Sequence, residues 1–206
     1  MPTPVSVITP NRFEQGLTFS EFLDQATVNR DKFELYYRDS PISDEDLTFF
    51  KKAAALPNGA AKILAIGEDW CGDVYRELPS VARIADATGI TLRIFIRDKN
   101  PDIMDEFLSN NGKARAIPVF VFYTEDMQYI THFTERPASA QAEIDALLDE
   151  VKTRVDLPKT ATFSDLQPAE KKEVIARILP RFEQWQKDSI REMRQLLGKV
   201  LNLPNG

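Results

Sequence analysis

The chain has 206 residues, of which 43% are hydrophobic and 28% are charged, a composition typical of a globular protein with a substantial core. Its formal net charge of −6 argues against nucleic acid as the main partner, because such binding requires clusters of Lys and Arg. No apolar run approaches the ~20 residues of a membrane span, and the N-terminus does not resemble a secretory signal. We therefore expect a cytoplasmic protein that binds neither nucleic acid nor membrane.

Cysteine and histidine each occur once, as Cys71 and His132. A single cysteine cannot form an intramolecular disulfide, and one cysteine with one histidine cannot supply a zinc site. We therefore expect no metal and no cofactor, and a thiol in the cytoplasm would be kept reduced. His132 lies on a predicted strand, where a structural or surface role is more common than a catalytic one.

The sequence of the N-terminal part predicts an extended arm followed by helices. Residues 1–17 contain three prolines and are expected to be extended, with residues 5–9 available as an edge strand. Thr18 and Glu21 have the spacing of a capping box, so a helix is expected to begin there. A polar stretch at residues 27–31 interrupts this helix, and the apolar pattern resumes after it.

Helices and strands then alternate along the chain. Four further helices are predicted, at residues 43–56 with Ser43 as the cap, 71–87 ending at Gly89, 101–109 and 138–155. Strands are predicted at residues 61–66, 91–96, 118–123 and 128–133, the last two as a hairpin. This order, βαβ followed by αββα, predicts an α/β fold with a mixed sheet and helices on both faces.

The chain is helical after Pro158. Thr162 or Ser164 is expected to cap a helix around residues 168–179, and Pro180 marks a kink or a fresh start. Apolar residues then recur every three or four positions and predict a packing face. They are Phe182, Trp185, Ile190, Met193, Leu196, Leu197 and Val200.

Four features between about Lys62 and Val155 carry a family likeness. Trp70-Cys71-Gly72-Asp73-Val74 follows a predicted strand and begins a helix, and Pro79 lies eight residues past the cysteine. Arg97-Asp98-Lys99-Asn100-Pro101 follows the next strand, and Ala116-Ile117-Pro118 precedes another. In this order and at these separations, the features resemble the Trp-Cys-Gly-Pro-Cys motif, the helix proline, the Asp-x-Asn-Pro run and the cis-proline loop of the thioredoxin superfamily.

The resemblance implies a thioredoxin-like core at residues 60–156, with an N-terminal arm and helices at 1–59 and a helical extension at 157–206. It also implies that Cys71 is the catalytic position and that the surrounding residues bind the substrate, namely Trp70, Gly72, Asp73, Ile117 and Pro118. The implied partner is a protein or a small thiol or disulfide such as glutathione. The oligomeric state stays open, and a dimer through the C-terminal helices is one alternative.

Two residues depart from the family pattern. Val74 stands where the family has its resolving cysteine, so an internal dithiol exchange cycle cannot run. Ala65 stands six residues before Cys71, where the family has a buried acid.

The protonation state of Cys71 decides between two functions. A helix N-terminus favours the thiolate, whereas three nearby carboxylates, Glu68, Asp69 and Asp73, disfavour it. Arg76 or Arg115 could offset the carboxylates, so the sequence leaves the sign of the pKa shift open. The first hypothesis is monothiol exchange, in which Cys71 forms a mixed disulfide that an external thiol resolves. The alternative is a redox-inactive module that binds a peptide or protein in the same groove.

Overall fold

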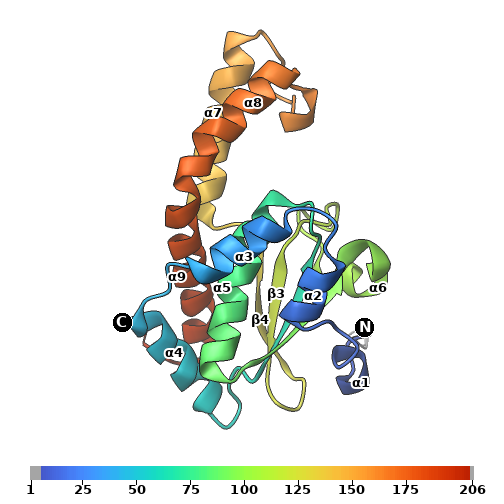
Figure 1. The fold of residues 1–206 in the computed structure, drawn as a ribbon, viewed down its shortest axis with the longest axis vertical. Helices are drawn as coiled ribbons and strands as arrows, with labels where there is room; N and C mark the ends of the chain where they lie inside the picture. The colour runs from blue at the N-terminus through green and yellow to red at the C-terminus, as the bar shows by residue number, and fades with distance from the viewer. Residues whose placement is uncertain (1–5, 205–206) are drawn as a thin grey trace.

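The protein was analysed as a computed structural model that describes residues 6–204. Its centre is a four-stranded sheet in the order β2-β1-β3-β4 (Figure 1). The strands are β1 (Lys62–Gly67), β2 (Thr91–Ile96), β3 (Val119–Tyr123) and β4 (Tyr129–Thr134). β1 pairs parallel with β2 and antiparallel with β3, and β3 pairs antiparallel with β4. The mixed α/β sheet expected from the sequence is confirmed.

The helices cover both faces of this sheet. The α-helices are α1 (Pro10–Phe13), α2 (Phe19–Gln25), α3 (Arg30–Arg38), α4 (Asp44–Ala55), α5 (Gly72–Thr88), α6 (Pro101–Met104), α7 (Ala138–Arg154), α8 (Pro168–Ile178) and α9 (Phe182–Leu201). α3, α4, α5 and α9 stand together on one side of the strands, and α1 and α6 on the other (Figure 1). All of β1 except Lys62 is buried, as expected for a central strand covered on both faces.

Local sequence signals explain where several helices begin and end. The Thr18–Glu21 capping box forms at the start of α2, and a second box forms between Ser43 and Asp46 at the start of α4. α5 ends at Gly89, whose φ of 77° belongs to the left-handed region that favours glycine. Pro79 lies inside α5 and is buried.

Three local expectations need correction. Of the proposed edge strand at residues 5–9, Val5 lies outside the described residues, and the other four form no strand; Thr9 instead caps α1. The helix expected over 101–109 is one α-helical turn, α6, followed by a 3-10 turn, Asp105–Phe107. Thr162 caps only a 3-10 turn, Phe163–Asp165, because α8 begins at Pro168 with Gln167 as its cap.

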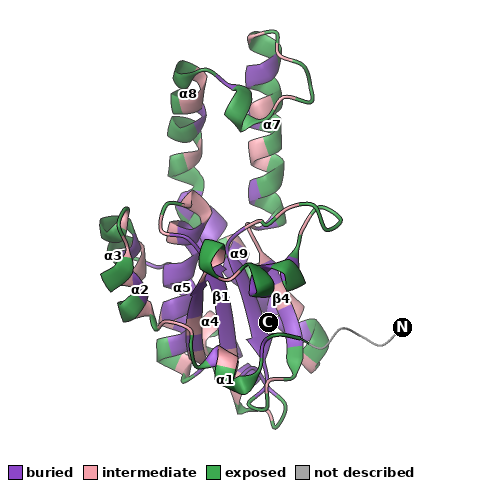
Figure 2. Ribbon diagram, turned by 90° about the vertical axis from the view of Figure 1, so that its right-hand side faces the viewer, coloured by how far each residue is buried: buried purple, intermediate pink, exposed green. Residues whose placement is uncertain are grey.

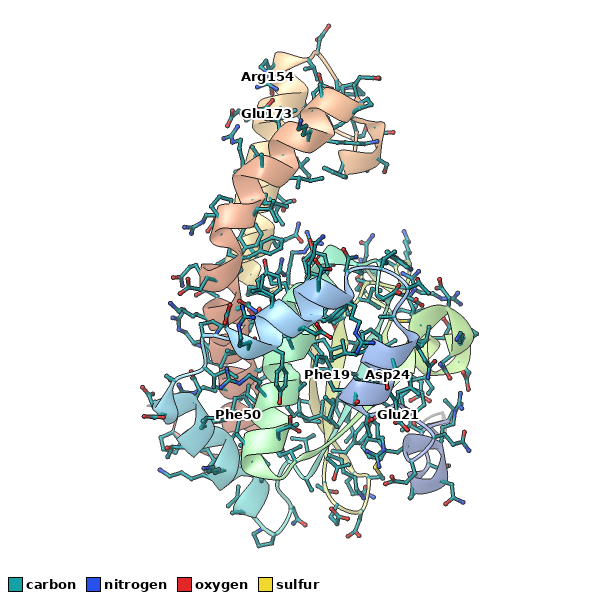
Figure 3. The ribbon with its side chains drawn as sticks, viewed as in Figure 1. Phe19, Glu21, Asp24, Phe50, Arg154 and Glu173 are labelled. Atoms are coloured by element: carbon teal, nitrogen blue, oxygen red, sulfur yellow. The ribbon has the colours of Figure 1, made fainter. Side chains whose placement is uncertain are left out.

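The C-terminal helices form a projecting arm and a return helix. α7 runs away from the sheet, α8 returns beside it, and α9 continues down onto the sheet after a 3-10 turn, Leu179–Arg181, that contains Pro180 (Figure 1). Residues of the arm are mostly exposed or half-buried (Figure 2). Its own small core consists of Leu147, Val151, Leu166 and Val174. Near the tip, Arg154 and Glu173 form an ion pair across the two helices (Figure 3).

α9 packs on β4 and α5 with the predicted apolar face. Its residues Ile190, Met193 and Leu197 belong to the main core, which joins the C-terminal helix to the sheet. The same face also contains Phe182 and Trp185, both buried. Val200, the last residue of the predicted face, is instead half exposed.

Candidate functional site

The connection between β1 and α5 places Cys71 at the N-terminus of a long helix. Cys71 is the N-cap residue of α5, with extended backbone dihedral angles, and its side chain is partly buried. One turn further on, Val74 is completely buried and packs closely on Gly67. A Cβ added at Gly67 would lie only 2.8 Å from Val74 Cγ1. The family's second cysteine position is therefore an apolar core position in this chain.

The loop before β3 faces the sulfur. Cys71 Sγ donates to the carbonyl oxygen of Ile117 at 3.7 Å, and the Ile117–Pro118 peptide bond is cis. The carbonyl of Ile117 thus accepts a hydrogen bond from the thiol, which favours the neutral form of Cys71. The N–H of Ile117 makes no hydrogen bond with any residue between 6 and 204. A main-chain donor therefore remains unused next to Cys71.

Aromatic groups border this corner. Trp70 is 52% exposed, although it is a large apolar residue, and the guanidinium of Arg97 lies 5.0 Å from its ring centroid. Tyr75 lies beside Gly72, where an added Cβ would be 3.6 Å from the Tyr75 hydroxyl. The exposed indole is available for contact with another molecule.

The α2–α3 turn holds the loop that carries Trp70. The carboxylate of Asp69 accepts hydrogen bonds from the Thr27 N–H at 2.6 Å, the Thr27 hydroxyl at 2.9 Å and the Val28 N–H at 3.2 Å. The side-chain amide of Asn29 donates to the Asp69 carbonyl at 2.9 Å. Part of the polar stretch that interrupts the first predicted helix is therefore a brace for the site.

Two arginines neutralise Asp73. Arg76 Nη1 lies 2.7 Å from Asp73 Oδ1, and Arg136 Nη2 lies 2.6 Å from Asp73 Oδ2. Arg76 is almost completely buried, and its guanidinium lies 5.0 Å from the Phe182 ring and 5.3 Å from the Trp185 ring. The C-terminal helix α9 thus forms part of the support beneath the site.

The balance of these interactions leaves Cys71 protonated at neutral pH. Burial raises the pKa of the Cys71 thiol, and the charge of Asp73 raises it further. The main-chain N–H groups of Val74 and Asp73 and the charge of Arg136 act in the opposite direction but do not overcome burial. The sign of the pKa shift, which the sequence leaves open, is therefore upward.

The structure brings together the residues that the resemblance implied. Cys71 and Ile117 are in contact, and Trp70, Gly72 and Asp73 adjoin Cys71 on one loop and helix start. Arg115 forms its ion pair with Asp105 and not with the carboxylates near Cys71, which are Glu68, Asp69 and Asp73.

The sequence did not predict two residues that contribute to the site, Arg136 and Asn29. Arg136 follows β4 and reaches Asp73 across 63 positions, and Asn29 reaches Asp69 across 40. A run of polar residues in a helical pattern was the only local signal for Asn29, and nothing adjacent to Arg136 indicates its partner.

Among residues 6–204, no three His, Cys, Asp or Glu side chains form a group that could hold a metal ion. In the same part of the chain, no helix is long and apolar enough to cross a membrane.

Comparisons with known proteins agree on the fold. A crystal structure of a protein of unknown function from Pseudomonas aeruginosa superposes with a TM-score of 0.59 at 14% identity, covering 93% of this chain and 98% of that one. A crystal structure of an HIV epitope-scaffold gives a TM-score of 0.60 at 14% identity, covering 93% and 99%. No curated protein matches the sequence. The family model described as thioredoxin matches residues 16–152, well over half of the sequence, and the chain therefore belongs to the thioredoxin family.

Proposed function

We propose that the Cys71 corner is a binding site for an extended peptide segment and that it acts without dithiol chemistry. The observation that carries this proposal is the unpaired N–H of Ile117, whose carbonyl meets Cys71, together with the exposed Trp70 one residue before that cysteine. An extended peptide can supply a carbonyl to that N–H and a side chain to the indole, so a main-chain hydrogen bond and a side-chain contact act together.

The state of the thiol supports binding rather than exchange. Thiol–disulfide exchange requires a thiolate, and burial of Cys71 together with its hydrogen bond to Ile117 favours the protonated form. Val74 removes the resolving thiol as well. Cys71 then serves as a small contact residue at the base of the site.

Peptide selection tests this proposal. Random nine-residue peptides displayed on phage are selected on the immobilised chain, and a selected peptide without cysteine is synthesised for affinity measurements. Trp70→Ala should weaken peptide binding at least about 10-fold, because a few aromatic anchor residues supply most of the binding energy of such interfaces. Tyr129→Ala is the matched control, because Tyr129 is 54% exposed and belongs to β4 rather than to this loop; it should leave the affinity within about twofold.

The second candidate is monothiol exchange with a disulfide such as oxidised glutathione. The position of Cys71 at the N-terminus of the 17-residue helix α5 favours it, since the N–H groups of Asp73 and Val74 stabilise a thiolate. In this reaction, Cys71 loses its proton and attacks one glutathione sulfur. A new S–S bond forms, the old one breaks, and the second glutathione leaves as a thiol.

Cys71→Ser separates the two candidates. Under the binding proposal, the variant retains affinity for the selected peptide, and mass spectrometry finds little glutathione on the wild-type chain after incubation with oxidised glutathione at pH 7. Rapid and complete glutathionylation, with loss of peptide binding in Cys71→Ser, would instead support exchange.

A further inference from the structure

A pocket lies at the end of the sheet opposite Cys71. Tyr123 pairs with Lys62 at the beginning of β1, whereas Cys71 follows the end of that strand. The pocket has a volume of about 360 Å³, within the range of small-molecule sites. Its lining comes from the segment before α1, the 3-10 turn after α6, the end of β3 and the strand β4. The site is therefore separate from the one described above.

Aromatic rings form its walls. Tyr123 and Tyr129 lie 6.3 Å apart between centroids at 76°, Tyr129 and His132 lie 5.9 Å apart at 52°, and His132 and Phe107 lie 5.4 Å apart at 63°. Successive rings are thus steeply tilted and pack on one another along the wall of the pocket, where the Tyr129 hydroxyl and His132 Nδ1 share a hydrogen bond of 2.6 Å. Aromatic rings attract cations through their negative faces, so an aromatic lining of this kind favours a cationic ligand.

The charge of the pocket is negative. Of the described residues that line it, Glu106 alone carries a formal charge at neutral pH, since burial lowers the pKa of His132 and keeps its ring neutral there. The Glu106 carboxylate accepts hydrogen bonds from the Ser6 hydroxyl at 2.7 Å and the Val7 N–H at 2.6 Å. A carboxylate has about four acceptor positions, so Glu106 retains the capacity to accept from a ligand.

The hydroxyl of Tyr123 is a second polar group of the pocket. Tyr123 is only 4% exposed, and its hydroxyl makes no hydrogen bond within residues 6–204. Burial and the nearby Glu106 raise the pKa of Tyr123, so the hydroxyl keeps its proton. The hydroxyl belongs to a residue that lines the pocket, and a ligand with an N–H group would donate to its oxygen.

We propose that this pocket binds a protonated alkylamine. The ammonium group donates to the Glu106 carboxylate and the Tyr123 hydroxyl oxygen, and the methylene groups lie against Phe107 and Tyr129. An anion is disfavoured by Glu106, and a neutral molecule gains neither the ionic contact nor the attraction to the rings. The pocket is separate from the Cys71 corner, and binding of an amine in it does not depend on the proposed function.

The test compares two probes of equal length, butylammonium and 1-butanol, by NMR titration of the full chain at pH 7.5. Butylammonium should bind at least about 10-fold more tightly than butanol, which corresponds to one strong cation–π or ionic contact. Glu106→Gln should abolish this preference while still accepting one hydrogen bond from the Ser6–Val7 segment. Tyr123→Phe should weaken butylammonium about threefold and leave butanol unchanged.

Glu125→Gln is the matched control, because Glu125 lies on the nearby β3–β4 turn but does not line the pocket. It should leave both affinities unchanged. Tyr129→Ala, at a half-exposed position, is the second variant in case Glu106→Gln fails to fold. It should also weaken the binding of butylammonium. Equal affinity for the two probes, no detectable binding of either, or a preference that survives Glu106→Gln would each overturn the proposal.

Discussion

Arg136 Nη2 lies 2.6 Å from Asp73 Oδ2, so a residue that follows β4 balances the charge in the motif that contains Cys71. Arg136 also contacts Glu135, and Arg76 holds the other oxygen of Asp73. Asp73 stands where the family motif has proline. The charge that this substitution introduces beside the thiol is therefore compensated from two other positions.

Removing Arg136 should make Cys71 less reactive. In Arg136→Gln, the positive charge that lowers the pKa of Cys71 is lost and Asp73 is less well compensated, so the thiol pKa should rise further. Alkylation by iodoacetamide at pH 8.5 should slow severalfold relative to wild type. Asp73→Asn is the reciprocal control and should speed the reaction, and equal rates in the two variants would contradict the charge balance.

Arg76 should be important for stability. It is 1% exposed and pairs with Asp73 and with Glu77, which is also 1% exposed. Arg76→Met should reduce the free energy of unfolding by about 3–5 kcal/mol, because Glu77 would remain buried without its cation. Urea denaturation measures this change. Arg154→Met, which breaks an exposed ion pair at the arm tip, is the control and should have little effect.

Local signals in the sequence predicted much of the fold because they act over a few residues. The strand at Thr91–Ile96 and the end of α5 at Gly89 follow from β-branched residues and a left-handed turn position. The contacts that build the site act over long distances. Arg136 meets Asp73, and Trp185 supports Arg76, only because the segment after β4 reaches the start of α5 and α9 packs beside α5. No periodicity or cap near these residues contains that information.

His132 should make stability depend on pH in a defined window. Burial lowers its pKa in the folded state below the reference value of 6.5, so the unfolded chain binds a proton more readily. The free energy of unfolding should therefore fall as the pH falls below about 6.5, until His132 is protonated in the folded protein as well. In His132→Gln, the decline between pH 7 and pH 5 should be shallower in urea titrations. Parallel pH profiles for the two proteins would contradict the assignment.

Restoring a second thiol should reveal whether the corner retains the family geometry. Val74→Cys places a thiol one turn into α5, at a buried position packed on Gly67, for an expected cost of about 1 kcal/mol. The variant should reduce insulin disulfides in the presence of dithiothreitol faster than wild type. Val81→Cys, also buried in α5 but two turns further on, should not. Absence of any gain in Val74→Cys would argue that the corner has lost that geometry.

The most direct test of the proposed function is the pH dependence of Cys71 alkylation in the native chain. A single cysteine makes the reaction unambiguous, and the denatured chain supplies the reference rate. The rate should follow a thiol pKa above the ordinary value of about 8.5, and at pH 7 the native chain should react more slowly than the denatured chain. A thiol pKa below that value, with native Cys71 reacting faster than the denatured reference, would contradict a binding role and favour monothiol exchange.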